Sequence, residues 1–516
     1  MKQDAFVGGG GENYAEKQFL KLNYANRHGL IAGATGTGKT VTLQILAEEF
    51  SAAGVPVFMA DVKGDLSGIA ASGRSDFKLH EAFQKRAAQI GFDTYSYDKF
   101  PVTFWDLFGE KGHPVRTTVA EMGPLLLARL LELTEAQEGI LNIAFRLSDE
   151  HGMALLDLKD LQALLVWVGE NRTDLALRYG NISVNSIGAI QRRLLILENQ
   201  GATELFGEPA LDLSDIMSLD QDGRGRINIL AADKLMASPR LYATFLLWLL
   251  SELFETLPEV GDPDKPKLVF FFDEAHLLFD DAPKALLDKV EQVARLIRSK
   301  GVGIYFVTQS PTDIPEDVLG QLGNRVQHAL RAYTARDRKA LRLASETYRD
   351  NPRFETEEAI LQVGVGEAVT SFLEDKGVPG VVQRTLIRPP SSQLGPLSNA
   401  YRAAVIAGSH LELKYRDRLD RHSAFEILQQ RAAEAAREGE EGQVALDGAG
   451  EEDIRAREFS SARRYSGARV GRSSARRVSG KDSFGAALGD ALIKELRGTT
   501  GRRIVRGVLG GLFKGR

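Results

Sequence analysis

A glycine-rich segment near the start of the chain has the residue types needed to hold a triphosphate. It reads Gly33-Ala-Thr-Gly-Thr-Gly-Lys-Thr40 and fits G-x-x-x-x-G-K-[ST] in full. Glycines let successive N–H groups turn toward one anion, and the following helix N-terminus adds partial positive charge. Lys39 would reach the β- and γ-phosphates of ATP, and Thr40 would bind Mg²⁺. The predicted nucleotide-binding residues are Gly33, Ala34, Thr35, Gly36, Thr37, Gly38, Lys39, Thr40 and Val41.

An acidic pair follows a second apolar run. Residues 268–272 read as a buried strand, and Asp273 and Glu274 come directly after it. Ligands of open α/β folds bind at the carboxyl ends of the strands, where Asp273 would hold Mg²⁺. Glu274 would orient or deprotonate the attacking water. An ordinary acidic turn is the alternative, and the phosphate loop elsewhere in the chain favours the catalytic interpretation.

Two further polar groups complete the predicted catalytic set of Lys39, Glu274, Gln309 and Arg325. Gln309 ends an apolar strand over residues 302–307, and it would face the γ-phosphate if that strand lies between those carrying the phosphate loop and Asp273. Arg325 precedes a predicted strand at 326–330 and would reach a neighbouring subunit's γ-phosphate. A plain turn and a surface arginine are the alternatives, and Arg331, Arg336 and Arg338 compete for the same role.

A parallel sheet is needed to bring these residues together. A strand at 30–32, the phosphate loop, a helix at 41–50 and a strand at 55–60 form a βαβ unit. The segment Asp61-Val-Lys-Gly-Asp65 ends that last strand at the same edge, where it contacts the nucleotide region or forms a simple glycine turn. Residues 1–28 only lead into the first strand. Further strands are predicted at 95–97 and 226–230, with an antiparallel hairpin over 361–373 at the sheet edge.

Changes of periodicity and composition divide the chain. Residues 117–199 have helical spacing and are too long for a crossover helix, which indicates a helical insertion. The predicted division is a nucleotide-binding core in two parts (1–104 and 223–390), a mainly helical insertion (105–222), a helical extension (391–440), and a flexible linker with a basic tail (441–516). The tail is expected to be disordered at first and to end in an amphipathic helix.

Composition places limits on the kind of protein. With 43% hydrophobic and 26% charged residues, the sequence is typical of a soluble globular protein. Because cysteine is absent, a disulfide framework and cysteine-ligated metals are excluded, and a cytoplasmic location is expected. The N-terminal stretch lacks the apolar core of a signal peptide, and the most hydrophobic segment, 241–257, contains Glu252 and Glu255, as a buried helix would.

Together the motifs resemble the HerA/FtsK superfamily of pumping ATPases, and within it the bacterial HerA-like helicase C-terminal domain proteins. The phosphate loop, Asp61-x-Lys63-Gly64, Phe272-Asp-Glu-Ala-His276 and Thr308-Gln-Ser-Pro311 carry the superfamily resemblance. The closer likeness rests on Asp61-Val-Lys-Gly-Asp-Leu-Ser-Gly68, Phe104-Trp-Asp106, Gly112-His-Pro-Val-Arg-Thr-Thr118 and the terminal Gly501–Gly510 string.

The resemblance implies a RecA-like core with an additional strand between the phosphate-loop and metal-binding strands. It implies homo-oligomeric rings, commonly hexameric, with ATP between subunits, an arginine supplied in trans, and movement of double-stranded DNA. HerA itself carries a small β-barrel before its motor, whereas the phosphate loop here begins at Gly33. A nuclease partner is therefore not expected, and ring formation would rest on other surfaces.

Three functions compete at this point. The first is an ATP-driven, ring-forming DNA translocase or helicase-like ATPase, whose basic tail would neutralise DNA phosphates. The second is a regulatory or scaffold ATPase that does not move DNA, with the terminal amphipathic segment docked on a partner or an anionic membrane. The third is a small-molecule kinase, which Glu274 and Gln309 disfavour because both suit water as the acceptor.

Overall fold

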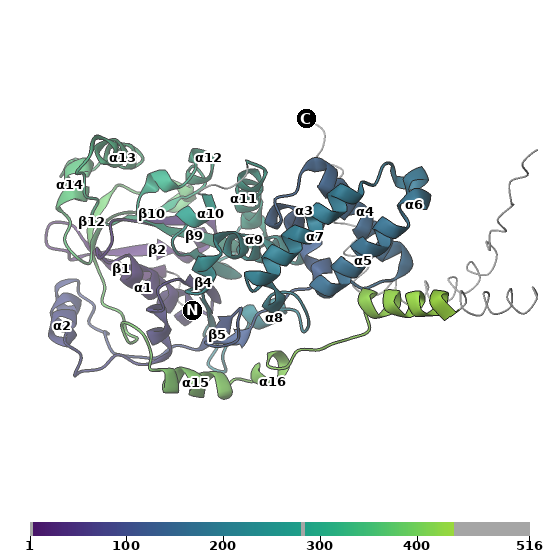
Figure 1. The fold of residues 1–516 in the computed structure, drawn as a ribbon. Coiled ribbons are helices and arrows are strands. Elements are labelled where there is room, and N and C mark those ends of the chain that lie inside the picture. The colour runs from purple at the N-terminus through teal and green to yellow at the C-terminus, as the bar shows by residue number, and fades with distance from the viewer. Residues whose placement is uncertain (1–3, 280–283, 438–516) are drawn as a thin grey trace, which may run out of the picture. The chain divides into compact units, whose positions relative to one another are not determined.

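A twelve-stranded sheet forms the centre of the protein in this computed structural model, which describes residues 4–279 and 284–437 (Figure 1). The strands are β1 (Asp4–Gly10), β2 (Glu16–Lys21), β3 (Gly29–Ala32), β4 (Val57–Asp61), β5 (Val102–Asp106), β6 (His113–Pro114), β7 (Ile227–Ala231), β8 (Leu268–Phe272), β9 (Val302–Thr308), β10 (Asn324–Gln327), β11 (Glu367–Ser371) and β12 (Gln383–Ile387). Their order across the sheet is β2-β1-β12-β11-β10-β3-β9-β8-β4-β7-β5-β6.

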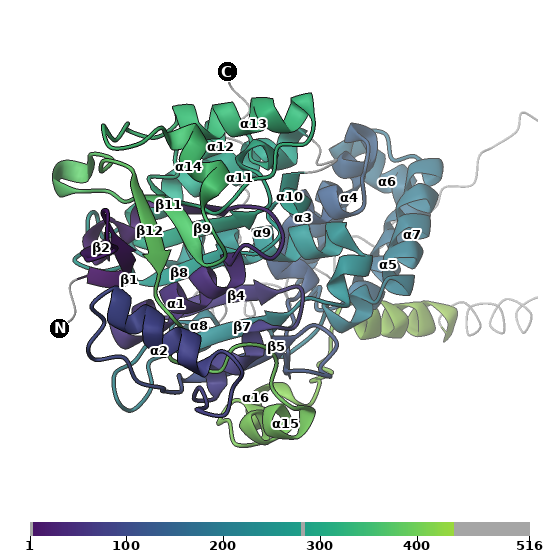
Figure 2. The ribbon, with the colours of Figure 1, turned by 90° about the vertical axis from the view of Figure 1, so that its left-hand side faces the viewer.

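The sheet combines a parallel region with an antiparallel extension. Strands from β10 through β3, β9, β8, β4, β7 and β5 to β6 pair in parallel. Strands β11, β12, β1 and β2 continue the sheet from β10 in antiparallel pairs (Figure 2). Strand β9 lies between β3, which leads into the phosphate loop, and β8, which leads to Asp273. The predicted α/β, RecA-like fold with an additional strand is confirmed.

Helices cover both faces of the sheet, so the parallel strands are buried on each side. The helices are α1 (Lys39–Ala52), α2 (His80–Gln89), α3 (Val119–Leu130), α4 (Glu135–His151), α5 (Leu158–Glu170), α6 (Arg172–Tyr179), α7 (Val184–Asn199), α8 (Leu213–Ile216), α9 (Pro239–Thr256), α10 (His276–Phe279), α11 (Lys284–Leu296), α12 (Glu316–Leu319), α13 (Ala335–Glu346), α14 (Thr356–Gln362), α15 (Asn399–Ala407) and α16 (Glu412–Tyr415). In β4, Val57 and Met59 join the apolar cluster of α1, whereas Phe58 and Ala60 join the cluster of α9.

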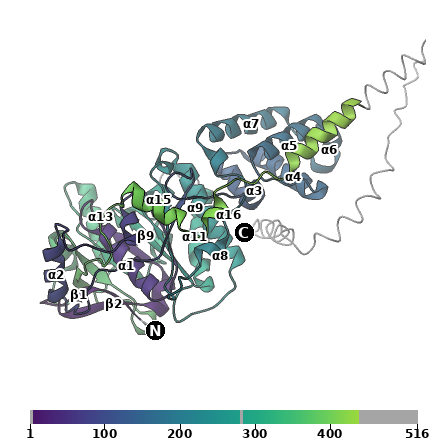
Figure 3. The same cartoon turned by 90° about the horizontal axis from the view of Figure 1, so that it is seen from below.

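The helical segment expected over 117–199 forms α3 to α7, which lie to one side of the sheet in two perpendicular views (Figure 1, Figure 3). The first of these helices begins with a capping box, in which Thr118 Oγ1 accepts from Glu121 N and the Glu121 carboxylate accepts from Thr118 N. Leu127, Leu141 and Leu194 belong to the same apolar cluster as the α9 face of the sheet. The helices therefore pack as a continuation of the core.

The first residues hold two strands where the sequence predicts only a lead-in. Strands β1 and β2 pair with each other, and β1 pairs with β12. Strand β1 is not predicted from residue propensities because it contains three consecutive glycines, a residue type that is rare in strands. Its glycines are required by close backbone approach, because a Cβ at Gly8 would collide with the Leu386 carbonyl and one at Gly9 with the Tyr14 carbonyl.

The strand predicted at 95–97 is wrong, and β5 at Val102–Asp106 occupies the sheet instead. The alternating tyrosines there serve side-chain contacts. Tyr95 Oη donates to the Pro390 carbonyl at 3.0 Å, and Tyr97 Oη lies 2.8 Å from His80 Nδ1. The alternation of Tyr95 and Tyr97 therefore reflects side-chain contacts and not pairing within the sheet.

The hairpin predicted over 361–373 is also wrong in its first strand. Residues up to Gln362 belong to α14, because Ala359, Ile360 and Val363 have the spacing of a buried helical stripe. The antiparallel hairpin is formed by β11 and β12, and it is not at the sheet edge because β1 and β2 follow β12. Strand β10 begins at Asn324 and ends at Gln327, so Arg325 lies within it and does not precede it.

The chain continues past the sheet through α15 and α16 to a helical stretch at 424–437. The segment 112–118 helps hold this extension, since Arg116 Nη1 donates to the Tyr415 carbonyl at 2.9 Å and His113 Nδ1 lies 3.2 Å from Glu412. The linker and basic tail predicted over 441–516 lie outside the described residues. Residues 1–436 form one compact unit, and the finer boundaries at 104, 222 and 390 stay predictions.

Candidate nucleotide site

The phosphate loop connects β3 to α1 and curls as its glycines allow. Gly33, Gly36 and Gly38 have φ values of 151°, 79° and 118°, which side chains with a Cβ rarely adopt. Helix α1 begins at Lys39, and no side chain caps its N-terminus. Its first N–H groups are therefore directed to the loop, where an anion can accept them.

The Lys39 ammonium is buried inside the loop. Its Nζ donates to the carbonyls of Gly33 at 2.6 Å and Ala34 at 3.2 Å. Burial lowers the pKa of Lys39, Lys63 lowers it further, and Glu274 and Asp273 oppose this. Lys39 and both acidic residues thus influence one another at one edge of the sheet.

Asp273 is a half-buried carboxyl group that follows β8 directly. Burial and the adjacent Glu274 raise its pKa to about 7, while Lys63 acts in the opposite direction. Its Oδ1 accepts from Glu274 N at 3.0 Å, and its backbone carbonyl accepts from Tyr242 Oη at 3.2 Å. A buried carboxylate favours a cation close by, because desolvation otherwise penalises its charge.

Glu274 is 7% exposed and occupies a left-handed backbone position with φ of 48°. Lys63 Nζ donates to its Oε1 at 2.7 Å. Its Oε2 has no hydrogen bond within the described part of the chain and lies 3.5 Å from His276 Nδ1. Burial raises the pKa of Glu274, but Lys63, His276 and Gln309 outweigh it, so the net pKa is lowered and the group is an anion near neutral pH.

Gln309 follows β9 and is exposed beside this acidic group. The loop that carries it is fastened by Asp313, whose Oδ2 accepts from Thr308 Oγ1 at 2.6 Å and from Ser310 N at 2.9 Å. Because β9 lies between β3 and β8, Gln309 emerges between the phosphate loop and the acidic pair. Thr40 and Val41 are half-buried in the first turn of α1.

Arg325 is engaged within its own chain. Its Nε donates to the Leu322 carbonyl at 3.0 Å, its Nη2 to Leu319 at 3.1 Å and its Nη1 to Thr347 at 3.5 Å. Burial lowers the pKa of its guanidinium. These contacts give Arg325 a structural role, while Arg331 and Arg338 are exposed. The action of Arg325 in trans stays a prediction.

His328 is a residue of this site that the sequence reasoning missed. It follows β10, is fully buried, and lies with Nε2 2.8 Å from Thr42 Oγ1 on α1 and Nδ1 2.9 Å from the Glu367 carbonyl. A Cβ at Gly33 would collide with its side chain. Polar residues ending an apolar strand, the signal that singled out Gln309, were present here as well.

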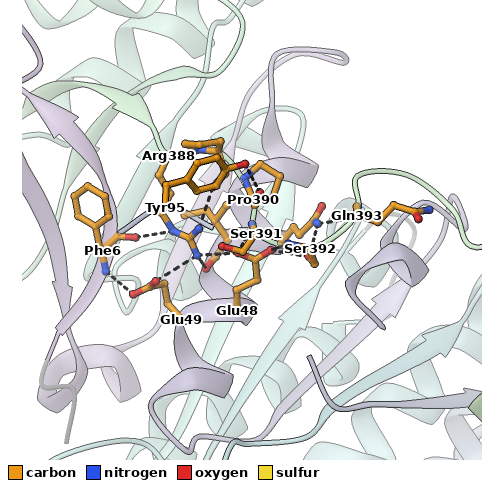
Figure 4. Close-up of polar contacts among 12 residues, drawn as sticks. Phe6, Glu48, Glu49, Tyr95, Arg388, Pro390, Ser391, Ser392 and Gln393 are labelled. Atoms are coloured by element: carbon orange, nitrogen blue, oxygen red, sulfur yellow. Dashed lines mark hydrogen bonds and ion pairs between the residues drawn. The ribbon is translucent and has the colours of Figure 1, made fainter. Parts of the chain in front are cut away.

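The far half of α1 is fixed by a buried ionic group, called here the Arg388 cluster (Arg388, Glu48 and Glu49; Figure 4). Arg388 Nη2 lies 2.9 Å from Glu48 Oε2 and 3.3 Å from Glu49 Oε1. Glu48 also accepts from Ser391 N and from Ser392 N and Oγ, and Glu49 accepts from Phe6 N. Helix α1 is thereby tied to segments from both ends of the core.

The sequence matches the family model described as Helicase HerA-like C-terminal over residues 10–516. The chain belongs to this family. No curated protein matches the sequence. Within residues 4–279 and 284–437, no helix is both long and apolar enough to cross a membrane.

Solved structures of related shape include bacterial coupling proteins and VirB4. The conjugative coupling protein TrwBdeltaN70 is 15% identical with a TM-score of 0.49, over 76% of this chain and 92% of that chain. VirB4 of Thermoanaerobacter pseudethanolicus is 14% identical with a TM-score of 0.49, over 75% and 97%. TrwB in complex with ADP and Mg²⁺ is 18% identical with a TM-score of 0.44, over 73% and 89%. The family assignment and the phosphate loop together support an ATPase.

Proposed function

We propose that this HerA-like protein hydrolyses ATP in a homo-oligomeric ring and uses the energy to move double-stranded DNA. One observation supports the ATPase part most strongly: β3, which leads into the phosphate loop, and β8, which leads to Asp273 and Glu274, run parallel on either side of β9, so Lys39 and the acidic pair lie at a single sheet edge. Family membership supports the motor class. The subunit number and the DNA are part of the proposal.

The residues have distinct parts in hydrolysis. The amides of the loop and of the α1 N-terminus bind the β- and γ-phosphates together with Lys39. Thr40 and the half-buried Asp273 would hold Mg²⁺, which neutralises charge on the phosphates. Glu274, an anion with one oxygen lacking a hydrogen bond among the described residues, accepts the proton of the attacking water. Gln309 contacts the γ-phosphate and reports whether it is present.

A neighbouring subunit completes the site in this proposal. Thr35 and Gly36 on the loop and Gln309 beside it are exposed in the single chain. An arginine from the next subunit would reach the γ-phosphate from this side and stabilise transition-state charge. Arg331 and Arg338 are exposed candidates beside the predicted Arg325, whose guanidinium is engaged internally.

The test is phosphate release from ATP at low ionic strength, with and without duplex DNA. We expect ATP turnover with water as the only phosphate acceptor. Duplex DNA should increase this turnover several-fold, because a translocase couples ATP hydrolysis to its movement along DNA. The increase should fall steeply as salt rises, since counterion release dominates such binding. Turnover that is unchanged by duplex or single-stranded DNA would overturn the DNA motor and leave a regulatory or scaffold ATPase. Absence of turnover under both conditions would overturn the ATPase itself.

A further inference from the structure

A lysine outside the phosphate loop makes the shortest contact to the proposed catalytic glutamate. Lys63 lies in the turn after β4, the strand next to β8. Its Nζ is 2.7 Å from Glu274 Oε1, with side-chain exposures of 47% for the lysine and 9% for the glutamate. One end of this ion pair is thus buried, where a charge contact is stronger than at the surface.

This contact leaves the glutamate half occupied. Oε1 is held by Lys63, whereas Oε2 has no hydrogen bond within the described ranges and lies 3.5 Å from His276 Nδ1. The backbone of Glu274 has φ of 48°, a strained position that persists only where neighbours fix it. A carboxylate held by one oxygen on a fixed backbone presents its other oxygen in a defined direction.

The turn that carries Lys63 is itself held firmly. Asp61 is 2% exposed, and its carboxylate accepts from Gly64 N at 2.7 Å, Asp65 N at 3.1 Å and Leu66 N at 3.2 Å. These three bonds close the chain around the lysine, so the Lys63 backbone has little freedom.

A segment after β12 supports the turn from outside. Ser67 Oγ accepts from Leu397 N at 3.0 Å, and Gln393 N donates to the Ala71 carbonyl at 2.8 Å. A Cβ at Gly68 would collide with the carbonyl of Gln393. The position of Lys63 is therefore set by the core on one side and by residues 393–397 on the other.

From this geometry we propose that Lys63 is a positioning residue for hydrolysis: it holds Oε1 of Glu274 so that Oε2 is directed to the attacking water. This inference rests on the proposed ATPase function. Lys63 acts through Glu274 and does not bind the triphosphate itself. The competing arrangement, in which the Lys63 ammonium binds the γ-phosphate directly, is an outcome of the test below.

The test is a double-mutant cycle of Lys63→Met and Glu274→Gln, read as single-turnover hydrolysis of ATP together with ATP affinity. We expect Lys63→Met to slow hydrolysis about 100-fold, the size of effect that a misplaced reacting group produces. ATP affinity should change less than about two-fold, because binding depends on the loop and Lys39. In the Glu274→Gln background, Lys63→Met should cause no further slowing, since the two residues act as a unit.

Lys63→Arg keeps a cation at this position, so it should recover most of the rate. The matched control is Lys234→Met, which removes a lysine of similar exposure (51%) from its ion pair with Glu110 and should leave hydrolysis unchanged. Lys63→Gln replaces Lys63→Met if the methionine variant does not fold, and far-UV circular dichroism with thermal unfolding shows folding independently of ATP binding.

Two results would overturn the inference. The first is a weakened ATP affinity in Lys63→Met, and the second is an additive loss of rate in the double variant; either would assign Lys63 to the phosphate. Normal hydrolysis in Glu274→Gln alone would instead contradict the proposed function, so the two failures are distinguishable.

Discussion

Two clusters of charged side chains lie near helix α1: the Arg388 cluster and the candidate site around Glu274. They differ in how many of their carboxylate oxygens accept hydrogen bonds. In the Arg388 cluster, Glu48 Oε1 accepts from both Ser392 N and Oγ, and Glu48 Oε2 accepts from Arg388 and Ser391 N. At the candidate site, Glu274 has one occupied oxygen and one without a hydrogen-bond partner among the described residues.

The difference separates a structural charge group from a reactive one. Buried polar networks that are fully satisfied make a unique, rigid structure, whereas a half-satisfied group costs stability and persists for another reason. The Arg388 cluster holds α1 in place, whereas Glu274 keeps one carboxylate oxygen that accepts no hydrogen bond from the described residues.

Arg388→Met should lower the free energy of unfolding by about 3–5 kcal/mol, because it leaves two buried carboxylates without their cation. Chemical denaturation measures the loss. The control is Arg342→Met, which removes an exposed i,i+4 pair with Glu346 and should cost less than about 1 kcal/mol. Equal losses in the two variants would contradict a structural role for the Arg388 cluster.

His328 should make stability sensitive to acid. Burial and the nearby Lys39 lower its pKa to about 4 from 6.5, so the unfolded chain binds a proton between these values and the folded chain does not. This contribution is present above pH 6.5 and is lost as pH falls toward 4, a loss of roughly 3 kcal/mol. His328→Gln lacks it, so the stability difference between wild type and variant should change by that amount over this range. A difference that does not vary with pH would show that His328 is not held neutral.

Much of the site could be predicted because its parts are contiguous in sequence. The phosphate loop and the acidic pair each combine an apolar strand with polar residues directly after it, and parallel pairing then places both at one edge. The sequence predicts that the segment 61–65, which contains Lys63, lies at this edge of the sheet. It does not predict the contact between Lys63 and Glu274, because the two residues are 211 positions apart. His328 carried a weaker signal, because no motif marks a single histidine after a strand.

The remaining features depend on contacts that no local pattern records. Glu48 and Arg388 are 340 residues apart, and both lie in segments whose local sequence is that of an ordinary helix and loop. Strand β1 is glycine-rich, and its place in the sheet depends on pairing with β2 and on the close approach of β12. The Trp105 motif, which helped to indicate the family, contributes here to packing, since Trp105 Nε1 donates to Asn228 Oδ1 at 2.9 Å.

The central claim is that the loop lysine and the acidic pair act on one nucleotide, and ATP labelled in its γ-phosphate tests it directly. Glu274→Gln should bind ATP with wild-type affinity and cleave it at least about 100-fold more slowly, because the proton acceptor is lost while the cradle remains. Lys39→Ala, measured alongside, should bind little or none. Wild-type cleavage by Glu274→Gln, or wild-type ATP binding by Lys39→Ala, would contradict the account.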